Sequence, residues 1–159
     1  MEDIAGKTGV PADVYLQYES GQTDLSISYL FELSRLYGID MTTILTGEEP
    51  HANVYSVVRG GKGVLVERRH DYRYESLAFS YKNKKMDPFM VRVPLSARPS
   101  SLYSHEGQEF VYVLEGVMKV FIDRHELTLQ PGDSVYFDST HPHGLCSPEG
   151  EARFLVVIS

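Results

Sequence analysis

The sequence has a single cysteine, Cys146, among 159 residues. One thiol excludes an internal disulfide and any metal site built from several cysteines, which suits a reducing compartment. No apolar run approaches the roughly 20 residues that a membrane-spanning helix needs. The first ten residues have neither a basic start nor the apolar core of a signal peptide. These absences predict a cytoplasmic protein that does not associate with membranes.

Positive charge is scarce in the first third of the chain. Residues 1–50 hold two basic and nine acidic side chains, so they carry a net charge of −7, which equals the net charge of the whole chain. Residues 51–159 are neutral overall, but within them residues 59–99 contain ten basic and four acidic side chains. The charge is therefore segregated by region, and the basic segment indicates an anionic ligand.

Hydrophobic periodicity divides the chain near residue 50. Apolar residues before it recur at helical spacing, as in Leu30, Leu33 and Tyr37, with Gly38 as the helix stop. After it the period becomes two, in nine short runs that begin with NVYSVV (53–58) and end with RFLVVIS. We predict a mainly β fold. It comprises a short all-α region over residues 1–48, a linker over 49–53, and a small antiparallel β-barrel or jelly roll over 54–159.

The helical region has the pattern of a helix-turn-helix. Ala5 lies four residues before the turn glycine Gly9, and Pro11 fits the first turn of a second helix. Residues 4–47 resemble the DNA-binding domain of the xenobiotic-response-element (XRE) family of repressors, whose matching second helix lies in the major groove. That resemblance implies an inward face of Val14, Tyr15 and Tyr18, and a DNA-binding face of Ala12, Asp13, Leu16 and Gln17.

Two features set this region apart from the XRE domain. The first helix of that domain is expected to be missing, because the chain begins too late to include it. A net charge of −7 also opposes phosphate contacts, which need a basic surface. Gln17 is suited to reading adenine, whereas Asp13 and Leu16 are poor groove residues. DNA binding and a helical appendage that serves packing or dimerisation are both compatible with these residues.

The stretch HEGQEFVYVLEG (105–116) places ligand-type side chains beside a predicted strand. Residues at even spacing share one face of a strand, so His105 and Glu109 can meet. After a PGD turn and a short strand, His143 can return beside them from an antiparallel neighbour. Two imidazoles and one carboxylate form the facial triad of Fe(II) sites, and the same ligands accept Zn, Mn or Ni. The alternative is a hydrogen-bonded cluster that holds no metal.

The spacing of these residues resembles the two motifs of the cupin superfamily, within residues 53–159. The first motif matches His105-x3-Glu109-x6-Gly116, and the second matches Gly132-x10-His143. The resemblance implies a small antiparallel barrel that binds one divalent metal through three histidines and a glutamate. Of these, Glu109 and two histidines are present.

Three positions depart from the cupin pattern. Tyr103 occupies the place of the family's first histidine, Asp138 stands where proline is usual, and Ser147 stands where asparagine is usual. His141, two residues before His143, is interpreted as a residue at the rim of the site. Tyr103 and His141 are therefore counted as candidates for ligand binding rather than as metal ligands.

The basic segment supplies further candidates for ligand binding, because arginine, lysine and tyrosine are residue types that grip carboxylate or phosphate. The candidates are Arg68, Tyr72, Arg73, Tyr74 and Lys85. An alternative for this segment is a solvated edge strand that lysines protect from aggregation. We adopt that interpretation for the stretch KNKK (82–85).

The order of helix-turn-helix followed by cupin resembles a class of bacterial and archaeal regulators in which the barrel senses a small molecule. We predict a transcriptional regulator-like protein whose cupin domain binds a small anionic ligand through a divalent metal. The alternative is a mononuclear non-haem iron enzyme of the hydroxypropylphosphonic acid epoxidase type. That type shares the domain order, the iron-ligand spacing and a Tyr-x-Tyr-x-x-Leu strand, here from Tyr72. It also uses a lysine of its helical domain, for which only Lys7 is available.

A homodimer is expected, because the repressors that this chain resembles bind two-fold operators. A purely structural dimer of barrels is the third possibility, and it applies if no metal binds.

Overall fold

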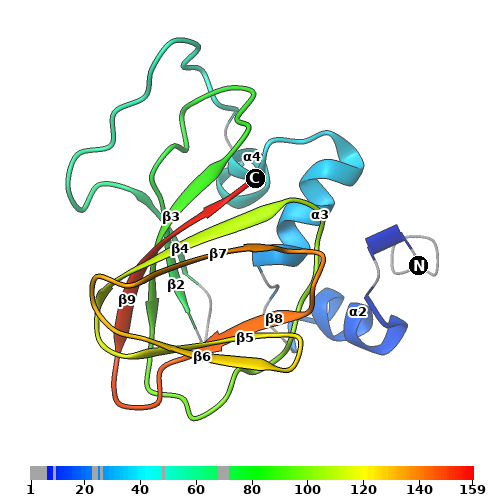
Figure 1. Cartoon of the computed structure of the whole chain (residues 1–159). Coiled ribbons are helices and arrows are strands. Elements are labelled where there is room, and N and C mark those ends of the chain that lie inside the picture. The colour runs from blue at the N-terminus through cyan, green and yellow to red at the C-terminus, as the bar shows by residue number, and fades with distance from the viewer. Residues whose placement is uncertain (1–6, 9, 23–24, 26, 48, 68–71) are drawn as a thin grey trace.

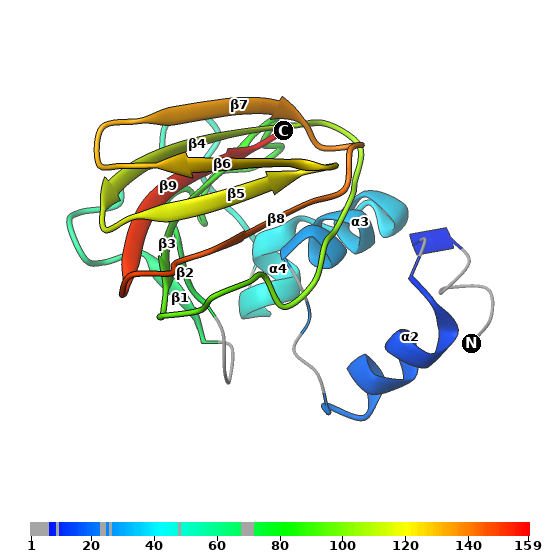
Figure 2. The ribbon, with the colours of Figure 1, turned by 60° about the horizontal axis from the view of Figure 1, so that its bottom comes forward.

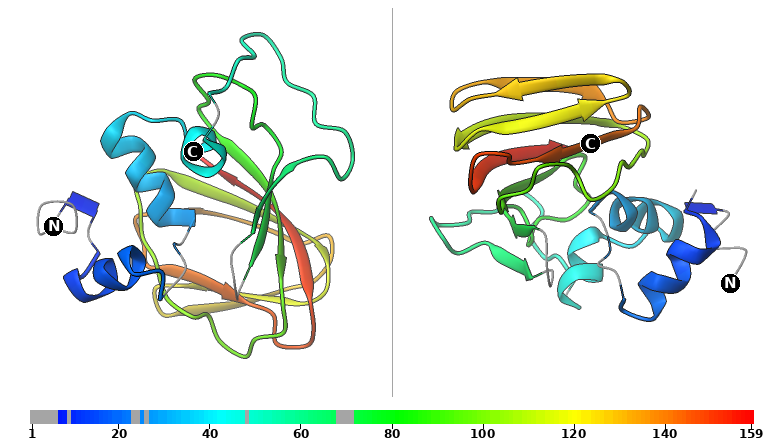
Figure 3. Two further views of the ribbon diagram at one scale, coloured as in Figure 1. Left: turned by 180° about the vertical axis from the view of Figure 1, so that it is seen from behind. Right: turned by 90° about the horizontal axis from the view of Figure 1, so that it is seen from below.

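The computed structural model describes residues 7–8, 10–22, 25, 27–47, 49–67 and 72–159. Figure 1 shows helices α2 (Ala12–Glu19), α3 (Ile27–Tyr37) and α4 (Met41–Thr46) on one side of a β-barrel. The view from below in Figure 3 separates the same two layers, with the strands on one side and the helices on the other. The predicted mainly β fold with short N-terminal helices is confirmed.

The helices begin and end at residues whose backbone conformation or side chain favours a helix boundary. α2 follows Pro11, whose φ of −54° suits a helix start. α3 ends before Gly38, which has a φ of +63°, a left-handed conformation that glycine adopts at low cost. Asp40 caps α4 by accepting a hydrogen bond from the backbone N–H of Thr42 at 2.8 Å. None of the described helices is long and apolar enough to span a membrane.

Nine strands in the described part of the chain form two antiparallel sheets. The six-stranded sheet has the order β1-β2-β3-β9-β4-β7, and the three-stranded sheet has the order β6-β5-β8. Figure 2 shows β5, β6 and β8 lying across β4 and β9. The strands are β1 (Val64–Glu67), β2 (Arg73–Ser76), β3 (Asp87–Val93), β4 (Gln108–Glu115), β5 (Met118–Ile122), β6 (His125–Leu129), β7 (Ser134–Asp138), β8 (His143–Cys146) and β9 (Ala152–Ile158).

The core lies between the inner faces of the two sheets. Buried and partly exposed residues alternate along β3, β9 and β4, as expected for strands with one covered face. Full burial of each large apolar side chain contributes about 1.5–3 kcal/mol to the stability of the folded state. On β4 the buried set is Glu109, Val111 and Val113, so one carboxylate shares a face with the apolar core.

One predicted strand is wrong, and one strand was not predicted. In the run NVYSVV, Val54, Tyr55 and Val57 are 84%, 75% and 59% exposed and form no strand. Residues of high β-propensity need a neighbouring strand, and none of the described strands pairs with this run. β8, in contrast, has no clear alternation, but it forms by pairing with β5, where His143 lies opposite Ile122.

The helices and the barrel share one core. Leu30 of α3 and Met41 of α4 belong to the same buried cluster as the inner residues of the barrel. Beside this cluster, Lys84 Nζ lies 2.8 Å from Asp87 Oδ1 and 3.2 Å from Asp40 Oδ1. The Lys84 side chain is only 4% exposed, so the interpretation of KNKK as a solvated stretch is wrong at this residue. Lys85 is exposed, as predicted.

Candidate functional site

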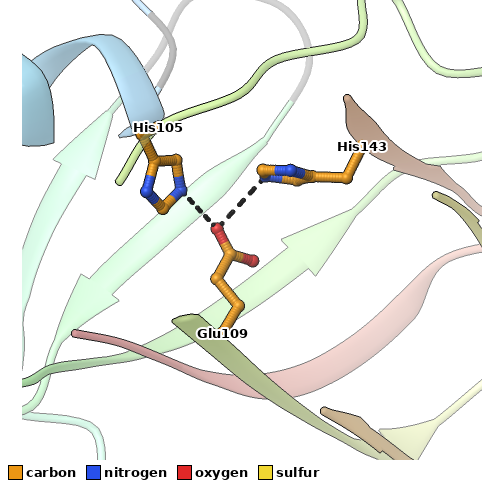
Figure 4. A group of neighbouring side chains, drawn as sticks. All are labelled: His105, Glu109 and His143. Carbon is orange, nitrogen blue, oxygen red and sulfur yellow. Dashed lines mark hydrogen bonds and ion pairs between the residues drawn. The ribbon is translucent and has the colours of Figure 1, made fainter. Parts of the chain in front are cut away.

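Three ligand-type side chains converge in the barrel. His105, Glu109 and His143 are all buried, and each offers one ligand atom within 4.8 Å of the others. Figure 4 shows both imidazoles directed at the same carboxylate oxygen of Glu109. In the described part of the chain, these three residues are the only group of three or more histidine, cysteine, aspartate or glutamate side chains whose ligand atoms lie this close together. We refer to these three residues as the triad.

Backbone pairing brings the triad together. Glu109 lies on β4, and His143 begins β8. Tyr103 and His143 form an isolated antiparallel bridge in which each N–H donates to the other residue's carbonyl at 2.8 Å. The N–H of His105 donates to the carbonyl of Ser139 at 2.9 Å. The segment before β4 is therefore fixed against the strand and loop that carry the third ligand.

The ring orientation of both histidines is set by backbone carbonyls. Nδ1 of His105 lies 3.0 Å from the carbonyl of Glu106, and Nδ1 of His143 lies 2.9 Å from the carbonyl of His141. A carbonyl oxygen only accepts hydrogen bonds, so each Nδ1 carries the proton and donates it. This arrangement directs both Nε2 atoms toward Glu109, as in histidines that bind metals through Nε2.

The resulting contacts require a cation. Nε2 of His105 lies 2.9 Å and Nε2 of His143 lies 3.3 Å from the same Oε1 of Glu109. In a neutral imidazole that is protonated at Nδ1, Nε2 bears a lone pair, and a lone pair facing a carboxylate oxygen is repulsive. The cluster is therefore favourable only when a proton or a metal ion lies among these three atoms.

Charge effects at the site agree with this requirement. Burial by itself raises the pKa of Glu109, but the hydrogen bonds from His105 and His143 outweigh it and lower the pKa to about 2. Burial by itself lowers the pKa of His105, yet the hydrogen bonds to Glu109 and to the Glu106 carbonyl raise it overall. Without a metal the site thus holds an ionised carboxylate and favours a proton on His105.

The donor spacing fits a metal ion. With bond lengths of about 2.1 Å, two ligand atoms lie about 3.0 Å apart at a right angle and about 3.4 Å apart at a tetrahedral angle. The two distances to Glu109 are 2.9 and 3.3 Å, so one lies within about 0.1 Å of the right-angle value and the other lies between the two values. Two nitrogens and one oxygen suit Fe(II), Zn, Mn or Ni, with coordination positions left for water or a ligand.

Aromatic rings flank the histidines, and one of them comes from the helical region. Phe137 of β7 lies 5.0 Å from the His143 ring, and Phe31 of α3 lies 5.3 Å from the His105 ring. Sequence reasoning did not single out Phe31, because helical periodicity marks an apolar face without showing what it packs against. Contact with α3 therefore makes the helical region a wall of the site.

Two polar contacts also join α3 to the segment that follows His105. Glu32 Oε1 accepts a hydrogen bond from the backbone N–H of Glu106 at 3.1 Å. The Arg35 guanidinium pairs with the Glu106 carboxylate. The residue next to His105 is thus held by α3 through both its backbone and its side chain.

The candidates on β2 and at Tyr72, the residue before it, divide between two faces. Tyr74 is buried against Phe89 with ring centroids 6.2 Å apart, and Tyr72 donates its hydroxyl to the carbonyl of Leu145 at 2.9 Å. Arg73 is exposed and points to the opposite face, because successive side chains on a strand alternate. The structure therefore does not bring Arg73 together with the two tyrosines. Arg68 lies outside the described residues.

The candidates near the second motif lie around the triad. The His141 side chain is 55% exposed, with Nδ1 2.8 Å from Asp123 Oδ2, so only its backbone carbonyl reaches the triad. Tyr103 is half-buried. Asp138 accepts hydrogen bonds from the N–H and hydroxyl of Thr140, which lower the pKa of this carboxyl. Ser147 is fully buried and donates to the carbonyl of Val117 at 3.0 Å.

The candidate DNA-binding residues lie on α2. Ala12, Asp13 and Leu16 are exposed, and Gln17 is partly exposed. Tyr15, which the helix-turn-helix resemblance placed on the inward face, is 7% exposed. Figure 3 shows α2 farther from the strands than α3 and α4 are.

Comparison with known proteins agrees with this architecture. Residues 1–44 match a family model described as helix-turn-helix, and residues 89–158 match one described as the cupin domain. No curated protein matches the chain. The chain therefore combines an N-terminal helix-turn-helix region with a C-terminal cupin domain, and the prediction of this combination is confirmed.

Solved structures share the fold. A helix-turn-helix family transcriptional regulator from Vibrio cholerae is 21% identical, with a TM-score of 0.66 over 99% of this chain and 85% of its own. Hydroxypropylphosphonic acid epoxidase from S. wedmorenis, in complex with fosfomycin, is 19% identical, with a TM-score of 0.56 over 99% and 88%. An RmlC-like cupin from Shewanella frigidimarina is 19% identical, with a TM-score of 0.58 over 66% and 90%.

Proposed function

We propose that this protein is a transcriptional regulator whose cupin domain binds a small anionic ligand through one divalent metal, held by His105, Glu109 and His143. The observation that carries the proposal is the contact between the two regions. The buried triad has the donor spacing of a metal site, and Phe31 of the helix-turn-helix region packs on the ring of His105. A change in the position of the His105 ring would therefore alter the packing of α3 directly.

The charge of the site determines the class of ligand. Two neutral imidazoles and one carboxylate would reduce a dication to a net charge of +1, and the metal would supply a Lewis-acidic position for a ligand oxygen. Tyr74 of β2 and Tyr72, the residue before this strand, would lie on the inner side toward that ligand. A carboxylate or phosphate is therefore the expected ligand class.

DNA binding is proposed through the exposed face of α2, and it is expected to be weak and sensitive to salt. Residues 1–50 carry a charge of −7, so few phosphates can be neutralised. Each phosphate contact that does form releases counterions and lowers log affinity by about 0.9 per unit of log salt, so binding that is already weak at low salt should be lost as the salt concentration rises.

Fluorescence anisotropy with DNA from the region upstream of the protein's own gene tests this proposal. Metal-loaded protein should bind a fragment at low salt, and removal of the metal should change the affinity. Gln17→Ala should weaken binding, by about 1–3 kcal/mol if this side chain contacts a base. Gln22→Ala, an exposed glutamine just after α2, should not weaken it. Absence of binding to every upstream fragment at low salt would refute the proposal.

An enzyme is the second candidate, because a triad of two histidines and a glutamate leaves open positions on Fe(II) and the epoxidase fold covers nearly the whole chain. Iron-loaded protein can be incubated with hydroxypropylphosphonic acid and hydrogen peroxide. Epoxide formation removes two hydrogens from the substrate, and the peroxide would be reduced to two waters. A new epoxide signal in the phosphorus NMR spectrum, lost in Glu109→Gln, would favour the enzyme over the regulator.

A further inference from the structure

A cavity with a volume of about 290 Å³ lies between α2, α3 and the segment that leads to His105. Val14 and Tyr18 of α2, Tyr29 and Glu32 of α3, and Leu102 contribute to its walls. None of the triad residues lines this cavity, so it is distinct from the candidate metal site. Its volume is close to the lower limit of small-molecule sites, about 300 Å³.

The cavity has one charged wall. Glu32 is the only charged residue among the described residues that line it. Glu32 Oε1 lies 3.8 Å from Nη1 of Arg35, and that same guanidinium pairs with the carboxylate of Glu106. One guanidinium thus pairs with two carboxylates, so the group formed by Glu32, Arg35 and Glu106 carries a net charge of −1.

Aromatic faces complete the environment. The rings of Tyr18 and Tyr29 lie with their centroids 4.8 Å apart and their planes tilted by 35°. The face of an aromatic ring carries negative charge density and attracts cations. Burial raises the pKa of Tyr29, so its phenol stays neutral at physiological pH. Val14 and Leu102 add apolar surface for the body of a ligand.

We propose that this cavity binds a small organic cation, a primary or quaternary amine attached to an apolar group about the size of one aromatic ring. The ammonium group would lie beside Glu32, and the apolar group would lie against Tyr18, Tyr29 and Leu102. This chemistry is the opposite of that expected at the triad, where a net positive site favours an anion. The proposal goes beyond the proposed function and does not require a metal.

The position of the cavity gives such a cation a means of acting on both regions. Tyr103, whose backbone is hydrogen-bonded to that of His143, forms part of its wall. The opposite wall includes Val14 of α2, the helix that carries the candidate DNA-binding residues. An occupant therefore contacts the helix proposed to bind DNA and a segment that positions the triad.

Isothermal titration of the full-length, metal-stripped protein tests the proposal with two probes of the same size. Benzylamine is a cation at neutral pH, whereas benzyl alcohol is neutral. Benzylamine should bind with a dissociation constant of about 1 mM or tighter, and benzyl alcohol should bind at least about tenfold more weakly, because it lacks the charge. Using metal-stripped protein excludes coordination of the amine by a metal ion.

Matched variants locate the site. Glu32→Gln keeps an acceptor for the N–H of Glu106 but removes the charge, so benzylamine affinity should fall at least about fivefold. Tyr18→Leu should also weaken benzylamine, because it removes one aromatic face. Glu126→Gln, on β6 and away from α2 in Figure 2, should leave the affinity unchanged. Equal binding of both probes would overturn the proposal, as would unchanged affinity in a folded Glu32→Gln or Tyr18→Leu protein, or no saturable binding of benzylamine.

Discussion

His105 and His143 each hold a backbone carbonyl through Nδ1, which leaves both Nε2 atoms directed at one oxygen of Glu109. A buried carboxylate is costly unless it is paired, and here its partners have no proton to give while both imidazoles are neutral. A metal ion satisfies all three atoms at once. A proton satisfies only part of the set.

Tyr103 is the residue at which metal affinity can be raised. It pairs with His143 in an antiparallel bridge, and directly opposed residues in such a pair project to the same face. Tyr103→His should therefore add a fourth ligand, as the cupin pattern has, and should increase zinc affinity by about tenfold or more. Competition with a chelating dye measures this change. Unchanged or weaker affinity in a folded variant would show that residue 103 does not face the triad.

At this scale the sequence predicted which side chains meet, but not what surrounds them. Even spacing along one strand predicts that His105 and Glu109 share a face, and the turn and short strand that follow predict the return of His143. The contact of Phe31 with His105 depends on how α3 packs against the barrel, which no local pattern encodes. The exposed position of Arg73 follows from strand alternation, which places it on the face opposite Tyr74.

Among the elements, the junction of α4 with β3 depends on one buried cation. Lys84 donates to Asp87, Asp40 and the hydroxyl of Thr42. Lys84→Met would leave two carboxylates without their partner, so the free energy of unfolding should fall by about 3 kcal/mol. Lys85→Met, at the exposed neighbour, should change it by less than about 0.5 kcal/mol. Urea unfolding followed by circular dichroism measures both, and equal effects would refute this role for Lys84.

The same junction predicts a dependence on pH. Burial raises the pKa of Asp87, while its hydrogen bond to Lys84 lowers it in part. Lys84→Met removes the lowering contribution, so the pKa rises further. A carboxyl with a raised pKa in the folded state costs stability above that pKa and loses this cost when it is protonated. The deficit of Lys84→Met should thus be largest at neutral pH and should shrink toward about pH 4. A deficit that grows on acidification would contradict this account.

Periodicity predicted most elements, and it failed where pairing decides the outcome. Gly38 as the stop of α3 and the alternation of β4 both follow from the local sequence. The run at 53–58 has the composition of a strand, yet none of the described strands pairs with it. β8 has little alternation and forms because β5 supplies its partner. The burial of Lys84 was likewise not predicted, because it depends on the approach of α4.

For the whole molecule, one face of the larger sheet remains uncovered in the described chain. Tyr136 is 63% exposed, Tyr112 is 37% exposed and Leu114 is 36% exposed, all on the outer side of β4 and β7. We expect this face to pair with a second copy of the chain, since two-fold interfaces are self-complementary. Sedimentation should give about twice the chain mass of 18.0 kDa.

A matched pair of tyrosines tests this dimer surface. Tyr136→Glu should shift the protein toward the monomer, because it places a charge within an apolar interface. Tyr55→Glu, at a 75% exposed residue outside the two sheets, should not do so. A parent protein that sediments as a monomer at all concentrations would contradict the prediction of a homodimer.

The most direct test of the central claim is the metal content of the full-length protein and two histidine variants, measured by mass spectrometry after metal-replete expression without nickel affinity purification. The parent is predicted to hold one divalent ion per chain. His143→Ala should lose most of it, because Nε2 of His143 faces Glu109, whereas His141→Ala should keep it, because only its backbone carbonyl reaches the triad. A parent without metal, or equal retention in both variants, would contradict the claim that His105, Glu109 and His143 form a metal site.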